Sequence, residues 1–436
     1  MQTPAGPKGT RDFFPEEMAF QEHIFSSWHK TCRRFGFEQY EAPMFESLEL
    51  YTQKSGSEIE QQLYTFADKK GRALALRPEL TPSLARMVAA RGTALKRPIR
   101  WYALPRLFRY EKMQKGRLRE FFQLNMDILG IAECTADAEL IAAVVAMMCD
   151  LGFTSADFTI HISSRKLLEE LFIALGIAAD QLRELYTLLD KRNKIPAEEF
   201  ALQCCAILPD EQIRTAILRL FDGATLATIA QNYPQAAAAA ELTKLFDLLT
   251  AYGIADFCAF DISVVRGLAY YTGIVFEVFD KTRELRAIAG GGRYDNLVKL
   301  YGGPDTPAVG FAAGDVVLAE LMRAKGIVPK QPPRSTVFIA SFSAESSAAI
   351  CTATMLRSAD IACEFALKKS NIGKQLDQAN AARVQFVVFV GGAEEAQQNV
   401  KIKNMATGSE ETISRHDLVR FLKHALNASP YEANRA

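Results

Sequence analysis

A concentration of positive charge in one short stretch is the part of the sequence best suited to chemistry. Residues 96–120 hold nine Lys or Arg residues against two Glu, a net charge of +7. Such a density of cations attracts phosphate groups. Arginine can bind phosphate through two parallel N–H donors, and Arg109, Arg117 and Arg119 are arginines rather than lysines. The stretch therefore predicts a phosphate-binding site.

Two strands joined by a loop around Gln114 to Arg119 would position these cations. Successive side chains of a strand alternate between its faces, so Arg109 and Glu111 would share one face of the first strand. The hairpin is thus predicted to have one polar and one apolar face, although a solvated sheet surface would look the same. The polar side chains expected on the second strand are Gln123, Asn125 and Asp127, and the apolar ones are Phe122, Leu124, Met126 and Ile128.

The remaining composition is ordinary and excludes several classes of protein. Lys plus Arg and Asp plus Glu both number 51, so nucleic acid could be bound only through local patches and not by bulk charge. The longest apolar run, Leu140 to Cys149, is about ten residues, whereas a membrane span needs about 20. Residues 1–13 lack the apolar core of a signal peptide. The spacing of the cysteines argues against a disulfide framework or a zinc site, so we expect reduced thiols and a cytoplasmic location. The short apolar runs predict no membrane partner.

Composition and periodicity divide the chain into five segments. Residues 1–152 and 254–328 contain short alternating strands, and residues 153–253 are mainly helical in pattern and acidic. Three prolines in residues 329–334 predict a semi-rigid linker. Residues 335–436 follow a β-α-β-α-β order with a closing helix, which predicts a small α/β domain with a partly parallel sheet. The predicted fold class is α+β, with a helical insertion and this C-terminal α/β domain.

Six short motifs follow one another along almost the whole chain. They are Pro7–Asp12, Glu41–Pro43 with Phe45–Glu46, Leu76–Thr81, Phe108–Glu111 with the loop Gln114–Arg119, Val265–Gly273, and Gly290–Asp295. In this order they resemble the histidyl-tRNA synthetases, a class II aminoacyl-tRNA synthetase family. The resemblance implies an antiparallel catalytic sheet flanked by helices in residues 1–152 and 254–328. It also implies that residues 335–436 form an anticodon-binding domain.

The activity implied by the resemblance is a two-step ligation. L-histidine would react with ATP, accompanied by Mg²⁺, to give histidyl-adenylate, and the histidyl group would pass to the terminal adenosine of the histidine tRNA. The resemblance implies no organic cofactor and no metal held by the protein alone. It implies a homodimer whose interface includes Pro43. Fixed cations at the α-phosphate would stabilise the transition state more than the ground state.

The resemblance also assigns individual residues. Arg109 and Arg266 would be catalytic, acting on the charge that gathers at the α-phosphate. ATP would be bound by Arg109, Glu111 and Arg117, and the tRNA acceptor end by Gln114 and Arg119. Histidine would be bound by Glu79, Thr81, Gln123, Asp127, Arg266, Tyr270, Tyr271 and Tyr294.

Some of these residues also have purely structural interpretations. Thr81 could be a helix N-cap that precedes Pro82. Tyr270 and Tyr271 would point to opposite faces of a strand, so only one of them would contact substrate. The glycines at 290–292 could form a tight turn before a helix at Tyr294. The cations expected to contact RNA in the C-terminal domain are Lys368, Lys369 and Lys374, for which a solvated loop is the alternative.

Two positions depart from the family pattern and keep other functions open. Ala269 stands where the family has an aspartate, and Val317 stands where motif 3 of class II enzymes has an arginine that stacks on adenine. Both favour a non-catalytic paralogue, the histidine-sensing regulatory subunit of ATP phosphoribosyltransferase. That paralogue ends after the catalytic-like domain, whereas this chain continues. A third hypothesis, an RNA-binding module without chemistry, leaves the histidine-site residues unexplained, so an active ligase is the favoured interpretation.

Overall fold

The chain folds into two units, Met1–Pro329 and Lys330–Ala436, each with a hydrophobic core of its own. The computed structural model describes residues 4–52, 61–192, 195–264, 270–329, 335–342, 347–392 and 398–427. Arg266, Ala269 and all of the predicted linker except Pro329 lie outside these ranges. Within the described residues, no helix has the length and apolar character needed to cross a membrane.

A nine-stranded sheet forms the centre of the first unit, in the order β1-β5-β7-β12-β11-β10-β8-β9, with β6 paired to β7. The strands are β1 (Glu38–Gln39), β5 (Ile99–Ala103), β6 (Arg106–Phe108), β7 (Glu120–Leu129), β8 (Phe158–Ser164), β9 (Cys258–Phe260), β10 (Ile274–Asp280), β11 (Ala289–Arg293) and β12 (Ala308–Gly314). Apart from the parallel pairs β1–β5 and β8–β9, the pairing in this sheet is antiparallel, as predicted. A small antiparallel sheet holds β2 (Phe45–Ser47), β4 (Ala73–Leu76) and β3 (Thr65–Ala67).

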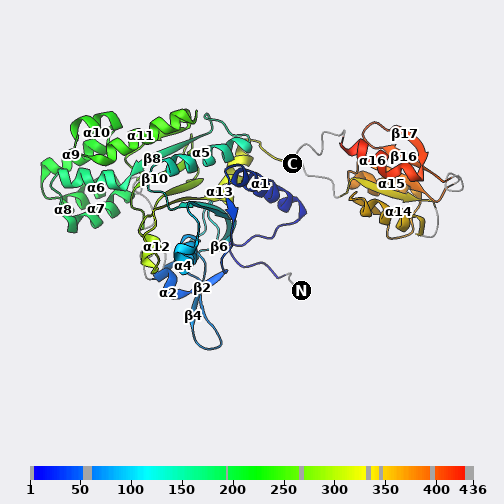
Figure 1. Ribbon diagram of the computed structural model, residues 1–436, viewed down its shortest axis with the longest axis horizontal. Helices are drawn as coiled ribbons and strands as arrows, with labels where there is room; N and C mark the ends of the chain where they lie inside the picture. Colours follow the sequence, from blue (N-terminus) through cyan, green and yellow to red (C-terminus); the bar gives the residue numbers. More distant parts are fainter. Residues whose placement is uncertain are drawn as a thin grey trace. The chain divides into compact units, whose positions relative to one another are not determined.

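Helices cover both faces of the large sheet and create two separate cores (Figure 1). One face packs against α1 (Pro15–Arg34), α5 (Thr135–Asp150) and α13 (Asp315–Ala324), and the other against α4 (Thr81–Arg91) and α12 (Leu297–Leu300), next to α2 (Leu48–Thr52). Strand β7 lies between the two cores, because Leu124, Met126 and Ile128 pack with α5 whereas Leu129 packs with α4 and α12. The alternation predicted for this strand is therefore confirmed, and its other face lies beneath α4.

The helical segment begins later than its predicted start at residue 153. Strand β8 lies inside the predicted segment but pairs with β10 and β9 in the large sheet. The helices that follow it gather at the β8 end of the sheet (Figure 1). They are α6 (Arg165–Ala174), α7 (Ala179–Lys191), α8 (Ala197–Ile207), α9 (Glu211–Phe221), α10 (Leu226–Asn232) and α11 (Ala237–Ala251). Short 3₁₀ turns occur at Gly92–Ala94 and Ala255–Phe257.

The second unit is a five-stranded mixed sheet in the order β14-β13-β15-β16-β17. Strands β13 (Val337–Ser341), β14 (Cys363–Phe365) and β15 (Phe386–Val390) are parallel. Helices α14 (Ser347–Ser358) and α16 (Leu418–Asn427) pack on one face, and α15 (Ile372–Ala381) packs on the other. The antiparallel strands β16 (Asn399–Asn404) and β17 (Glu410–Ser414), and the 3₁₀ turn Arg415–Asp417, were not predicted.

Candidate active site

Two buried carboxylates lie at the centre of the candidate site. Asp127 on β7 is 2% exposed, and Glu79, just before α4, is 3% exposed. The Tyr294 hydroxyl donates to Asp127 Oδ1 at 2.5 Å, and the Tyr270 hydroxyl donates to Glu79 Oε2 at 2.9 Å. The second oxygens, Asp127 Oδ2 and Glu79 Oε1, are buried and have no hydrogen-bond partner among the described residues. Since a buried acceptor without a donor is costly, these two oxygens suit a ligand that brings N–H donors and positive charge.

Burial shifts the titration of both carboxyl groups. It raises the pKa of Asp127 to about 7, although the hydrogen bond from Tyr294 acts in the opposite direction. Burial also raises the pKa of Glu79, while the positive charge of Arg109 and the Tyr270 hydroxyl oppose that rise. Perturbed carboxyl groups that share an enclosed site are typical of functional centres. A bound cation would stabilise both carboxylates and restore their ionised forms near neutral pH.

The backbone opposite Asp127 is built to admit its carboxyl group. Gly310 on β12 pairs with Asp127 on β7. A Cβ atom at Gly310 would overlap the Asp127 carboxyl, whereas one at Gly314, at the end of the same strand, would meet nothing within 4 Å. Gly310 therefore provides the space that Asp127 occupies. Local sequence does not show this requirement, because it depends on the pairing of strands far apart in the chain.

The glycines at 290–292 form part of strand β11, so the alternative of a tight turn is wrong. A Cβ atom at Gly292 would lie 2.7 Å from the Ile274 carbonyl oxygen, and one at Gly291 would overlap the backbone of Gly310. The strand therefore needs glycine for close packing with its neighbours. Tyr294 follows the strand directly and precedes α12, which begins at Leu297.

Three tyrosines gather around the carboxylates. The Tyr270 ring centroid lies 5.2 Å from that of Tyr271 and 5.9 Å from that of Tyr294, both in edge-to-face geometry. Neither Tyr270 nor Tyr271 belongs to a strand, so the opposite-face argument does not apply to them. Burial, followed by the charge of nearby carboxylates, raises the pKa of both hydroxyls and keeps them protonated as donors.

Thr81 also faces this group. The N-cap of α4 is Leu80, and no side chain makes a capping hydrogen bond there, so the N-cap interpretation of Thr81 is wrong. Its side chain instead lies near the Tyr270 hydroxyl, where it lowers the pKa of that group against the larger effect of burial. Gln123 lies four residues before Asp127 on β7 and is half-buried, on the same face of that strand.

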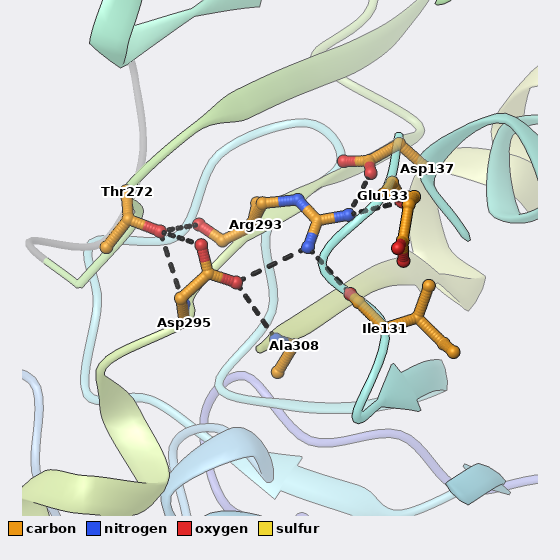
Figure 2. Close-up of polar contacts among 7 residues, drawn as sticks. All are labelled: Ile131, Glu133, Asp137, Thr272, Arg293, Asp295 and Ala308. Atoms are coloured by element: carbon orange, nitrogen blue, oxygen red, sulfur yellow. Dashed lines mark hydrogen bonds and ion pairs between the residues drawn. The ribbon is translucent and has the colours of Figure 1, made fainter. Parts of the chain in front are cut away.

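A buried arginine to which the sequence assigned no role holds the tyrosine-bearing segments in place (Figure 2). Arg293 is 4% exposed, forms an ion pair with Asp137 at the start of α5, and donates to the Ile131 carbonyl at 2.9 Å. Asp295 accepts from Arg293 and from Thr272, beside Tyr271. The same guanidinium thus joins the ends of β7 and β11 to the segment that carries Tyr270 and Tyr271. Burial raises the pKa of Asp137 to about 6, and the charge of Arg293 opposes that rise.

Arg109 connects the carboxylate site to the cationic stretch. Strand β6 ends at Phe108, and the chain turns so that the Glu111 N–H donates to the Arg109 carbonyl at 2.8 Å. The predicted common strand face for Arg109 and Glu111 is therefore wrong. The Arg109 guanidinium donates to the Pro78 carbonyl at 2.8 Å and lies 5.4 Å from the Phe121 ring centroid. Its charge acts on Glu79 from this position.

The loop after Arg109 is held by local contacts. Arg117 forms an ion pair with Glu111, which is 8% exposed. Gly116 adopts φ 75° in the turn from Gln114 to Arg117, and its N–H donates to Glu320 on α13 at 3.0 Å. Gln114 is exposed, and the Arg119 guanidinium lies 4.0 Å from the Tyr110 ring centroid.

Val317 lies beneath this loop, where the motif 3 arginine was expected. It is 7% exposed and belongs to the core that contains α5 and α13. A Cβ atom at Gly116 would lie 3.2 Å from its side chain. The N-terminal motif supports the same region, since the Gly9 carbonyl accepts from the Arg119 N–H at 2.9 Å and Arg11 pairs with Asp315 at 2.7 Å. The sequence motif had not indicated this supporting role.

Most of the predicted site residues thus fall into two adjoining groups. The first contains Glu79, Thr81, Asp127, Tyr270, Tyr271 and Tyr294, with Gln123 on the same strand face as Asp127. The second follows β6 and contains Arg109, Glu111, Gln114, Arg117 and Arg119. Together they place two buried carboxylates with unpartnered oxygens beside a loop rich in arginine, an arrangement that suits a substrate with an ammonium group next to a phosphorylated one.

Two family models match the chain. One described as "Histidyl-tRNA synthetase" matches residues 9–315, and one described as "Anticodon binding domain" matches residues 336–425. A curated relative from Opitutus terrae, named histidine–tRNA ligase, is 41% identical over 95% of this chain and 97% of its own length.

Solved structures share the fold. The histidyl-tRNA synthetase of Nostoc sp. PCC 7120 superposes with a TM-score of 0.81 at 24% identity and covers 98% of this chain and 100% of its own. A Bacillus halodurans protein described as an ATP phosphoribosyltransferase regulatory subunit/histidyl-tRNA synthetase superposes with a TM-score of 0.74 at 23% identity, covering 90% of this chain and 100% of its own. The fold therefore does not separate ligase from regulatory subunit, and the more similar sequences carry that distinction.

Proposed function

Because the chain belongs to the histidyl-tRNA synthetase family, we infer that it ligates L-histidine to its tRNA with ATP as the second substrate. The observation that carries this function at the site is the pair of buried, unpartnered oxygens, Asp127 Oδ2 and Glu79 Oε1, within the part of the chain that the structure describes. They suit the α-ammonium group of an amino acid, which supplies three N–H donors and a positive charge. The charge of Arg109 acts on Glu79, and we assign the reacting carboxylate of histidine and the α-phosphate of ATP to this side of the site.

In the first step, a carboxylate oxygen of histidine attacks the α-phosphorus of ATP and pyrophosphate leaves. In the second, a ribose hydroxyl of the tRNA terminal adenosine attacks the histidyl carbonyl carbon, and AMP leaves. Negative charge grows at the α-phosphate in the first transition state, and we propose that Arg109 and Arg266 stabilise it. ATP enters with Mg²⁺ as its counter-ion.

We assign the remaining ATP contacts to Arg117 and Glu111. Arg117 would bind the β- and γ-phosphates by exchanging its Glu111 partner for phosphate oxygens. Val317 is buried beneath the loop and supplies no cation to cover the adenine, so we assign the base to contact with Phe121. The rejection of analogues that lack the amino group follows from the unpartnered carboxylates they would leave behind.

We also propose a homodimer. Met44, Phe45 and Phe66 are 48%, 50% and 42% exposed on and beside the small sheet that follows Pro43, and the rings of Phe45 and Phe66 lie 5.9 Å apart. Such a patch of large apolar side chains suits burial against a second copy. Light scattering is expected to give twice the mass of the chain, 48.3 kDa. The eight free cysteines agree with a reducing compartment, and we place the protein in the cytoplasm.

The regulatory alternative has Val317 in its favour, and one experiment separates the two. Histidine-dependent exchange of labelled pyrophosphate into ATP reports adenylate formation without tRNA. We expect exchange that requires histidine and is not supported by other amino acids. Histidine binding by the folded protein without any exchange would instead favour the regulatory subunit.

A further inference from the structure

An exposed aromatic ring lies at the edge of the second unit. Phe342 follows β13 and is 54% exposed, whereas its stacking partner Phe389 on β15 is 9% exposed. The two rings are 5.9 Å apart between centroids with an interplanar angle of 27°. One face of Phe342 is therefore supported by a core residue while much of the ring remains open to solvent. Exposing a phenyl ring costs hydrophobic free energy, which suggests a partner for the open side.

The position of this ring in the topology is informative. Phe342 lies at the carboxyl end of the parallel strands β14, β13 and β15, and its N–H donates to the Val390 carbonyl at 2.9 Å. The chain leaves β13 toward α14 on one face of the sheet and leaves β14 toward α15 on the other. In open α/β sheets, ligands bind outside the carboxyl ends of the strands, near such a divergence.

Positive charge accompanies the ring. The loop after β14 contains Lys368 and Lys369, both exposed, and Leu367, which is 87% exposed. Gln375, a buried residue of α15, donates to the Ser341 and Ser370 carbonyls, each at 2.9 Å. The side chain of Gln375 thus holds the lysine-bearing loop against the end of β13, next to Phe342.

Aromatic rings flanked by cations are the usual means of binding single-stranded nucleic acid, because every base has a face that can stack and every nucleotide carries a phosphate. We propose that the open face of Phe342 stacks on one unpaired base of the tRNA and that Lys368 and Lys369 neutralise neighbouring phosphates. This inference rests on the proposed function, since it names how the second unit holds the RNA substrate. A protein partner would use the apolar ring without needing the lysines.

The test compares three variants of the full-length protein. Phe342→Ala is expected to raise the Kd for a histidine tRNA transcript, and the KM for tRNA in aminoacylation, roughly 10- to 100-fold. Phe342→Trp keeps a ring and is expected to stay within a few-fold of the wild type. Ile350→Ala is the matched control, because Ile350 on α14 is 49% exposed but has no proposed RNA contact.

The readouts distinguish failure of this inference from failure of the proposed function. Pyrophosphate exchange needs no tRNA, so all three variants should keep the wild-type exchange rate, which also shows that they fold. If the wild type exchanges but Phe342→Ala binds tRNA with wild-type Kd, the stacking role is wrong although the ligase function stands. An equally weakened tRNA affinity in Ile350→Ala would also overturn it. Lys368→Gln with Lys369→Gln should weaken tRNA binding and reduce its salt dependence by about 0.7 for each phosphate that is no longer neutralised.

Discussion

The two regions proposed to bind substrate differ in how far their binding groups are exposed to solvent. The first places the carboxylates of Asp127 and Glu79 almost out of solvent, where ionisation is costly and each unpaired oxygen demands a specific donor. The second exposes Phe342, Lys368 and Lys369 on a surface where their charges cost little and their contacts are generic. A small molecule recognised atom by atom suits the first, and a long polyanion recognised through a few bases suits the second.

This difference predicts the size and the character of mutational effects. In the buried site, one misplaced atom leaves a charge without a partner, so the effects should be large and should depend on pH. On the exposed surface, water takes the place of a removed side chain, so the effects should be moderate and should depend on salt. The contrast would fail if the two regions responded alike to the same kind of change.

Arg109→Gln should cause the greatest decrease in activity. Removing the cation beside Glu79 takes away charge stabilisation at the α-phosphate, and pyrophosphate exchange should fall on the order of 1000-fold. Arg106→Gln is the matched control on the same stretch, because Arg106 is 42% exposed and pairs with Glu120 at 2.7 Å. That control should stay within a few-fold of wild type. Similar decreases in both variants would mean that bulk charge, and not the position of Arg109, matters.

Gly310→Ala should disturb the histidine pocket through a single methyl group. The new Cβ would displace the Asp127 carboxyl, so the KM for histidine in the exchange assay should rise on the order of 100-fold. Gly314→Ala, on the same strand, adds a methyl group in open space and should leave that KM unchanged. A normal KM in Gly310→Ala would contradict the role given to Asp127.

The pH dependence of histidine binding should follow Asp127. Its pKa of about 7 means that the carboxyl is protonated in the free protein below pH 7. The KM for histidine should therefore rise as the pH falls below 7, by roughly tenfold per pH unit. Asp127→Asn should have a high KM and lack this component, which leaves only the titration of the substrate imidazole.

The same group sets a stability trend of opposite sign. Between its ordinary pKa near 4 and about 7, the folded protein keeps a proton on Asp127 that the unfolded chain has released. This carboxyl therefore makes the free energy of unfolding decrease as the pH rises through that window. In urea titrations at pH 8, Asp127→Asn should be more stable than wild type without histidine. A less stable variant would show that ionised Asp127 does not destabilise the folded protein in the absence of histidine.

Salt should have little effect on the buried site. Raising the salt concentration from about 0.05 to 0.3 M should weaken tRNA binding several-fold, because phosphate contacts release counter-ions. The KM for histidine should change less than about twofold, since Asp127 and Glu79 are shielded from solvent. Equal salt sensitivity of both constants would remove the contrast between the two regions.

Periodicity within a single strand predicted the parts of the site that depend on local sequence. The alternation along residues 120–129 correctly placed Asp127 opposite Met126 and Ile128. The first strand of the hairpin is shorter than predicted, because the chain turns after Phe108. The hydrogen bond from the Glu111 N–H to the Arg109 carbonyl that closes this turn leaves no signature in the pattern of side chains. Strands β16 and β17 were missed because both contain many polar side chains, which are largely exposed on β17 and half-buried on β16, so that the two segments resemble loops in sequence.

Features set by distant strands could not be predicted. The glycines of β11 look like turn residues, yet they are required by the backbone of Ile274 and Gly310 on neighbouring strands. The ion pair of Arg293 with Asp137 spans 156 positions and has no local pattern. The family motifs identified the glycine segment as functional but did not show what each of its residues contacts.

The contacts of Arg293 affect how easily the chain between α5 and β11 could become longer by insertion. Its guanidinium closes the chain between α5 and β11, so α6 to α11 emerge as a loop whose two ends are already fixed. For a flexible loop, the entropy of closure grows only with the logarithm of its length, about 0.6 kcal/mol for each doubling. The entropy of loop closure would therefore oppose the addition of helices in this stretch only weakly, whereas removal of α6 or α11 would expose core side chains such as Leu168 and Leu245.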